Sequence, residues 1–146
     1  MVMQERISKE HGRTWFIDLD GTVFEHNKYL EHPGKTERPL PHALEFLRCI
    51  PEHDTVVFTT GRKGRDLKAT IVSLRKAHIR FDHIVGGLPN GARILINDEK
   101  LVHDRKTAIG VTVSRNGRAG SSHQKLSKRL YRVIDKDTAG VCAATQ

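Results

Sequence analysis

The order of apolar and polar residues along the chain predicts strands that alternate with helices. Short apolar or β-branched runs predict five strands, at Trp15–Ile17, Thr55–Thr59, Phe81–Val85, Arg93–Ile96 and Thr107–Val113. Apolar residues at helical spacing predict helices over about 41–50, 65–78 and from Ser122 onward. Strands that alternate with helices favour right-handed βαβ units, so we expect an α/β fold with a mainly parallel five-stranded sheet.

A length of 146 residues leaves room for one domain with a tail. We expect a folded domain over residues 1–115, followed by a basic helix and a disordered tail over residues 116–146. Residues 23–40 contain Pro33, Gly34 and Pro39 and show no clear period, which predicts a loop or small flap.

The net charge of +8 is concentrated near the C-terminus, where residues 114–146 carry 7 Lys and Arg against 2 Asp and Glu. A basic tail can attract nucleic acid or an acidic partner, although many such tails only aid solubility. We find no apolar run of membrane-spanning length and no signal peptide. We therefore expect no membrane association. Cys49 and Cys142 form neither a metal-binding spacing nor a disulfide framework, which fits a reducing compartment, so we expect a cytoplasmic location.

Polar clusters follow three of the predicted strands. They are Asp18 with Asp20, the segment Thr60-Gly61-Arg62, and Asn97 with Asp98. In a parallel sheet these clusters converge at the carboxyl edge, where ligands of open α/β sheets bind. We therefore expect one site that is built from several strand ends.

The two carboxylates of Asp18 and Asp20 point to the same side of extended backbone. Such carboxylates repel each other unless a cation lies between them or one is protonated. Mg²⁺ is the hard, oxygen-ligated ion that suits this pair, and Asp98 could complete the set. An isolated pair of this kind would more often cap turns, but this pair stands beside two further clusters.

The clusters resemble the motifs of the haloacid dehalogenase superfamily. Phe16–Val23 (FIDLDGTV) is similar to the first motif, Val56–Arg62 (VVFTTGR) to the second, and Arg93–Asp98 (RILIND) to the fourth. The resemblance covers about residues 13–115, and its later part looks most like small bacterial members associated with surface-polysaccharide sugar phosphates. It implies a Rossmann-like three-layer α/β sandwich. The flap over residues 23–40 is too short for a cap domain.

The resemblance also implies roles for individual residues. Asp18 would be the nucleophile that forms an aspartyl-phosphate. Asp20 would protonate the leaving oxygen and later activate water. The Asp18 carboxylate, the Asp20 backbone carbonyl and Asp98 would hold Mg²⁺. Thr60 would bind a phosphoryl oxygen, and Gly61 and Arg62 would join it in binding substrate.

The third motif departs from the family pattern. Members place a Lys against the phosphoryl group, but the corresponding segment here reads Gly87-Leu88-Pro89. Another cation must serve if the chain is active, since phosphoryl transfer needs positive charge at the equatorial oxygens. Arg93 and Lys68 are the candidates, and Arg93 lies closer in sequence to the expected position.

Basic residues after the second motif, Arg62, Lys63 and Arg65, would line the rim of the site or face water. Without a cap the site would be open, which suits a bulky substrate or a homo-oligomer whose partner covers it. We found no nucleotide-binding glycine motif in the chain.

The sequence therefore favours a Mg²⁺-dependent phosphomonoester hydrolase that acts on a sugar phosphate or related metabolite. Two alternatives remain open. The basic charge would suit a phosphatase of nucleic-acid ends. Leu88, in place of the expected cation, would suit a catalytically weak domain that serves as an interaction module.

Overall fold

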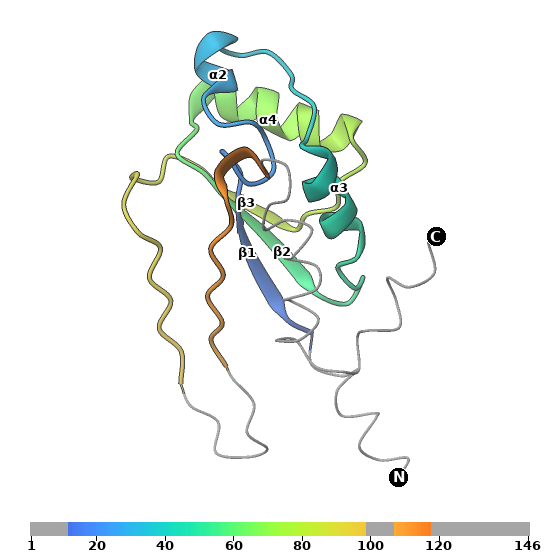
Figure 1. Ribbon diagram of the computed structural model, residues 1–146, viewed down its shortest axis with the longest axis vertical. Coiled ribbons are helices and arrows are strands. Elements are labelled where there is room, and N and C mark those ends of the chain that lie inside the picture. The colour runs from blue at the N-terminus through green and yellow to red at the C-terminus, as the bar shows by residue number, and fades with distance from the viewer. Residues whose placement is uncertain (1–11, 99–106, 118–146) are drawn as a thin grey trace.

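The computed structural model describes residues 12–98 and 107–117 (Figure 1). Its sheet has three strands in the order β1-β2-β3, and both pairings are parallel. The strands are β1 (Thr14–Asp18), β2 (Thr55–Thr59) and β3 (His83–Val85). The mixed α/β fold with a parallel sheet is thereby confirmed, and β1 forms one edge of the sheet.

Two helices connect the strands. Helix α3 (Pro41–Arg48) begins with a proline, whose missing N–H has no partner to lose in the first turn. Helix α4 (Gly64–Lys76) joins β2 to β3. The predicted helices over 41–50 and 65–78 are thus present, with ends that differ by about two residues, as is usual for helix termini.

The flap over residues 23–40 holds one short helix, α2 (Lys28–Glu31), which lies at the upper end of the molecule in Figure 1. A single 3-10 turn, η1 (Arg115–Gly117), ends the second described segment. The flap is therefore a loop with one helical turn, in agreement with its lack of sequence periodicity.

The hydrophobic core lies on the face of the sheet that α3 and α4 cover. Both crossovers step in the same direction along the sheet, so right-handed connections place both helices on one side. Trp15 of β1 packs edge-on against Phe46 of α3, with 5.8 Å between ring centroids. The buried core consists of Ile17, Leu19, Val23, Phe24, Ile50, Val56, Phe58, Leu74 and Ile79.

A buried carboxylate ties the amino ends of β1 and β2 together. Asp54 accepts hydrogen bonds from the backbone N–H of Arg13 at 2.9 Å and from Nε1 of Trp15 at 2.8 Å. Its side chain is fully buried. Because a buried carboxylate needs such donors, Asp54 fixes the register in which the two strands start.

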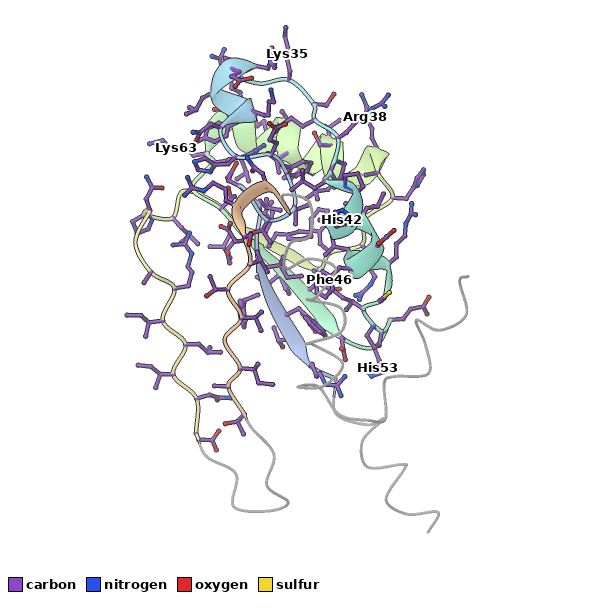
Figure 2. The ribbon with its side chains drawn as sticks, viewed as in Figure 1. Lys35, Arg38, His42, Phe46, His53 and Lys63 are labelled. Carbon is purple, nitrogen blue, oxygen red and sulfur yellow. The ribbon has the colours of Figure 1, made fainter. Side chains whose placement is uncertain are left out.

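The predicted strands at Arg93–Ile96 and Thr107–Val113 are not present, so the five-stranded sheet and the three-layer sandwich are not shown. Both segments are extended, without strand pairing, and most of their side chains are exposed. Ile94 and Ile96 are 83% and 89% exposed. Figure 2 shows the side chains of the segment over residues 93–98 projecting to both sides of the chain.

The connection that precedes the expected fourth strand is short. A parallel neighbour of β1 requires a crossover of roughly a dozen residues, usually a helix. Only residues 86–92 separate β3 from Arg93, and they include three glycines and a proline. In Figure 1 the segment over 93–98 accordingly runs away from α2, and the edge of β1 stays open. Phe16 on that strand is 60% exposed.

Cys49 is disulfide-bonded, which corrects the expectation that the cysteines form no disulfide. The argument from cysteine usage for a reducing compartment is therefore lost, and the cytoplasmic location stays a prediction. No helix in the described part of the chain is long and apolar enough to cross a membrane. The predicted C-terminal helix and tail lie outside the described residues, apart from 116 and 117.

We expect replacement of Asp54 by Ala to lower the free energy of unfolding by about 2–4 kcal/mol, because it leaves two donors without their charged acceptor. Urea unfolding followed by the fluorescence of Trp15, the single tryptophan, measures the change. Glu52→Ala, at an exposed neighbour, is the control and should cost less than about 0.5 kcal/mol. Equal losses in the two variants would contradict the assigned role of Asp54.

Candidate functional site

The carboxyl end of β1 runs directly into a tight turn that positions two aspartates. The carbonyl oxygen of Leu19 accepts hydrogen bonds from the N–H groups of residues 22, 23 and 24. Gly21 has a φ of +86°, and a Cβ there would lie 3.0 Å from Cγ of Arg115. Glycine is therefore required for both backbone conformation and space. The turn holds Asp18 and Asp20 on either side of the buried Leu19.

Asp18 is a half-buried carboxylate beside a second carboxylate. Burial raises its pKa above the ordinary value, and the charge of Asp20 raises it further. A hydrogen bond from Oγ1 of Thr22, at 3.3 Å, and the charge of Arg93 act in the opposite direction. Burial and the neighbouring carboxylate thus outweigh the groups that stabilise the charge of Asp18.

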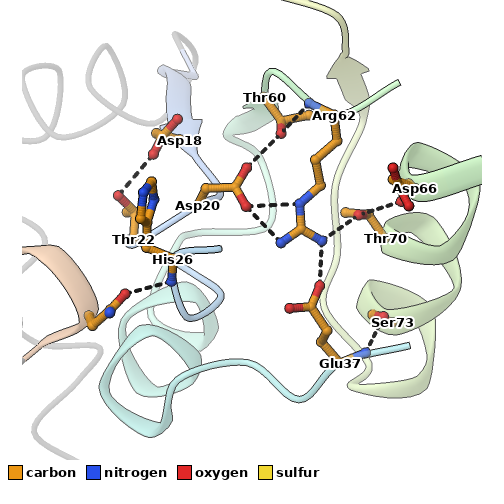
Figure 3. Close-up of polar contacts among 11 residues, drawn as sticks. Asp18, Asp20, Thr22, His26, Glu37, Thr60, Arg62, Asp66, Thr70 and Ser73 are labelled. Carbon is orange, nitrogen blue, oxygen red and sulfur yellow. Dashed lines mark hydrogen bonds and ion pairs between the residues drawn. The ribbon is translucent and has the colours of Figure 1, made fainter. Parts of the chain in front are cut away.

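Asp20 is held by three donors from the loop after β2. Its Oδ1 accepts from Nε and Nη2 of Arg62, at 2.9 and 2.7 Å, and its Oδ2 accepts from Oγ1 of Thr60, at 3.0 Å (Figure 3). Oγ1 of Thr60 in turn accepts from the backbone N–H of Arg62 at 3.1 Å. The hydroxyl proton of Thr60 therefore points to Asp20 in this state.

Arg62 does not lie at the rim of the site, where the sequence analysis had placed it as one alternative. It is only 2% exposed, and its guanidinium stacks on the rings of Phe24 and Tyr29, 5.3 and 4.7 Å from their centroids. Burial opposes its charge, but hydrogen bonds to Asp20 and Glu37 raise the pKa of Arg62 above its ordinary value. It is thus a charged residue inside the domain.

Sequence reasoning missed Glu37, the second carboxylate on this guanidinium. It accepts a short hydrogen bond from Nη1 of Arg62, which also donates to Oγ1 of Thr70 at 2.8 Å. The backbone N–H of Glu37 donates to Oγ of Ser73 at 2.8 Å. A charged residue in a loop carries no periodic signal, so nothing in the sequence marked it.

Asn116 is a further residue at the site that the sequence indicated only as a turn. Its φ of 59° fits that expectation. Its backbone N–H donates to the carbonyl of Gly21 at 2.8 Å, and its Oδ1 accepts from the N–H of His26 at 2.6 Å. Residues far apart in sequence therefore meet at the turn after β1.

The remaining predicted residues are more scattered. Gly61 adjoins Leu88, because a Cβ there would lie 3.3 Å from the Leu88 carbonyl oxygen. Arg93 is exposed and donates to the carbonyls of Pro89 and Gly91, yet its charge acts on Asp18. Lys68 is an exposed residue of α4.

Asp98 is exposed at the end of the segment that leaves the sheet. Within residues 12–98 and 107–117, no three His, Cys, Asp or Glu side chains gather closely enough to hold a metal ion. The structure therefore brings Asp18, Asp20, Thr60 and Arg62 together but does not add Asp98 to them.

No family model, curated protein or solved structure matches the chain in the comparisons that we made. The resemblance to the haloacid dehalogenase superfamily accordingly rests on the motifs in the sequence.

We expect Asp18→Asn to raise the thermal midpoint at neutral pH, without metal, by on the order of 2–4 °C. The folded-state pKa of Asp18 lies above 3.8, so its ionisation disfavours the folded chain. The advantage of Asn should vanish below that pH, where both states bind the proton, and grow as the pH rises above it.

Thermal unfolding of both proteins across pH, with and without Mg²⁺, measures this effect. Mg²⁺ should stabilise the wild type and leave Asp18→Asn unchanged, because bound ligand stabilises only a chain that can hold it. Glu45→Gln, on the exposed face of α3, controls for loss of one negative charge. If the variant is less stable than wild type at every pH, the claim that ionisation of Asp18 destabilises the folded chain is wrong.

Proposed function

We propose that the protein is a Mg²⁺-dependent phosphomonoesterase that works through an aspartyl-phosphate on Asp18. The observation that carries the proposal is the convergence of Asp18, Asp20 and Thr60 at the carboxyl edge of a parallel sheet. This edge is where open α/β sheets bind ligands. The sequence motifs of the haloacid dehalogenase superfamily supply the reaction type.

The donor groups fit Mg²⁺ in kind. Carboxylate and carbonyl oxygens are its usual ligands, and a cation would offset the burial and the neighbouring charge that raise the pKa of Asp18. The Asp18 carboxylate and the Asp20 backbone carbonyl would hold the ion, with Asp98 as the third protein ligand. When bound, the ion would offset the negative charges of the nucleophile and the phosphoryl oxygens.

The reaction then divides between two aspartates. A carboxylate oxygen of Asp18 attacks phosphorus, and the bond between phosphorus and the leaving oxygen breaks. Asp20, in its protonated form, gives a proton to that leaving oxygen. In the second half its carboxylate takes a proton from the water that attacks phosphorus, while the bond between phosphorus and the Asp18 oxygen breaks. To exchange a proton with substrate, the Asp20 carboxylate must give up part of its contact with Arg62 or Thr60.

Arg93 is the better supported of the two candidate cations for the phosphoryl group. Its charge lowers the pKa of Asp18, whereas Lys68 does not figure among the influences on that carboxyl group. Its present hydrogen bonds go to exposed backbone carbonyls, which a phosphoryl oxygen can replace.

We retain the five-stranded sheet as part of this proposal. The open edge of β1 and the exposed apolar residues over 94–96 are complementary, because a strand with apolar side chains on both faces needs cover on both. Parallel pairing of Arg93–Ile96 along β1 would bring Asp98 to the edge that carries Asp18. Residues 86–92 would then have to run as an extended connection back to the amino edge of the sheet, in place of the usual crossover helix.

The substrate that we propose is a sugar phosphate or a related phosphorylated metabolite in the cytoplasm. This choice rests on the resemblance to small members linked to polysaccharide sugar phosphates. The flap adds only the single turn α2 above the strand ends, so a second copy of the chain would serve to cover the site.

We expect hydrolysis of 4-nitrophenyl phosphate and of several sugar phosphates with Mg²⁺, and none with EDTA. Asp18→Asn should lower kcat by at least about 1,000-fold, and Asp20→Asn by about 100- to 10,000-fold. Steady-state assays measure both, with Glu45→Gln as the control.

The same panel should include oligonucleotides with 3′- or 5′-phosphates at several salt concentrations. Salt-sensitive turnover of these alone would favour a nucleic-acid end phosphatase over a metabolite phosphatase. No turnover of any compound by a folded protein that binds Mg²⁺ would contradict the proposed function.

We expect the amides of residues 94–97 to exchange slowly with solvent deuterium in the Mg²⁺-bound protein, at rates similar to those of β2. Pairing with β1 would protect them, whereas amides of an unpaired exposed segment exchange at once. Hydrogen exchange read by mass spectrometry measures this, with the peptide that contains Thr55–Thr59 as the protected reference. Fast exchange at 94–97 with saturating Mg²⁺ would rule out the fourth strand.

A further inference from the structure

Three charged side chains are hydrogen-bonded in series inside the site, with the cation of Arg62 between the carboxylates of Asp20 and Glu37. Nε and Nη2 of the guanidinium face Asp20, and Nη1 faces Glu37 and Thr70 (Figure 3). The Arg62 side chain is 1% exposed and the Glu37 side chain 10%. One buried cation is thus shared by the proposed acid/base and by a residue of the flap.

Glu37 is poorly accounted for by stability alone. Its Oε1 is buried and finds no hydrogen-bond partner among the described residues. A buried carboxylate oxygen without a donor costs free energy, so a smaller or neutral residue would suit simple packing better. The Glu37 carboxylate is hydrogen-bonded to the guanidinium of Arg62, and its charge also acts on Lys28.

Hydrogen bonds hold the flap over residues 23–40 in place around Glu37. The backbone N–H of Glu37 donates to Ser73 on α4, and three residues earlier the N–H of Gly34 donates to Oδ1 of Asp66, at 2.7 Å. The N–H of Leu40 donates to the carbonyl of Val23 at 2.8 Å. These bonds seat the flap on α4 and deliver the Glu37 carboxylate to Arg62.

We propose that Glu37 is a positioning residue for Asp20 and acts through Arg62. This inference rests on the proposed phosphatase function. Glu37 and Thr70 hold the Nη1 side of the guanidinium, which orients its Nε and Nη2 side toward Asp20. Because the guanidinium is held on both sides, the Asp20 carboxylate is kept in one orientation.

The proposal predicts a loss that depends on the leaving group. An alkyl oxygen needs a proton as it departs, whereas 4-nitrophenolate is a stable anion and needs little help. With Gln at position 37, the charge-assisted hydrogen bond to Nη1 becomes a weaker neutral one, so the guanidinium is held less firmly in the orientation that presents Nε and Nη2 to Asp20. Proton transfer to the leaving oxygen should then suffer, while attack by Asp18 should not.

The test compares kcat/KM for an alkyl sugar phosphate and for 4-nitrophenyl phosphate, because kcat/KM reports the steps up to departure of the leaving group. Glu37→Gln should lower the alkyl value by about 10-fold or more and the aryl value by less than about 3-fold. Glu25→Gln, an exposed acid of the same flap, should leave both values unchanged. Arg62→Lys, which keeps the charge but cannot span both carboxylates, should show the same split as Glu37→Gln.

The outcomes separate the inference from the proposed function. If the wild type is active and Glu37→Gln matches Glu25→Gln on both substrates, the inference is wrong and the phosphatase stands. Equal losses on both substrates would assign Glu37 a purely structural role and would likewise overturn the inference. If the wild type turns over neither substrate, the proposed function is wrong, and the role of Glu37 in positioning the acid/base Asp20 is wrong with it.

Discussion

The site depends on the ion-paired guanidinium of Arg62, buried between Asp20 and Glu37. Several kilocalories per mole are needed to desolvate such a cation, and partners on both sides offset that cost only when their geometry is maintained. The rings of Phe24 and Tyr29 stack on it, and Oγ1 of Thr70 accepts from its Nη1. Thr60 accepts from the backbone N–H of Arg62 and donates to Asp20. The loop after β2, the turn after β1 and the flap are thereby fixed to one another.

This arrangement places two kinds of carboxylate at one edge of the sheet. Asp20 is matched by an internal cation, whereas Asp18 is half-buried, lies beside a like charge and has its pKa raised. Groups with such different surroundings suit different chemical roles. Asp20, which is paired with a cation, is suited to a fixed orientation. Asp18 is suited to binding a metal ion and to attack on phosphorus.

Much of the fold could be predicted because segments with strong local patterns are also the segments that pack in the core. The apolar run before Asp18, the β-branched run Thr55–Thr59 and the helical spacing after Pro41 each produced the expected element. The run Arg93–Ile96 is equally apolar, but a pattern of apolarity does not reveal the path of the connection that precedes it. In the structure the run is unpaired, and β1 keeps an open edge.

The candidate site was predictable only where its residues follow strands. Asp18, Asp20 and Thr60 stand at strand ends, and the parallel sheet brings them together. The inward direction of Arg62 and its contact with Glu37 depend on how a flap without periodicity folds back on α4. Sequence spacing contains no information about that contact, so tertiary structure was needed to find it.

The central claim is that Asp18 forms a covalent bond to phosphorus. The most direct measurement is to quench the enzyme with acid during turnover of a phosphate monoester, treat it with borohydride and analyse the peptide that contains Asp18 by mass spectrometry. An aspartyl-phosphate is reduced to homoserine, so the account predicts homoserine at position 18, dependent on substrate and Mg²⁺. An unmodified Asp18 in an enzyme that is turning over, or modification at a different carboxylate, would contradict it.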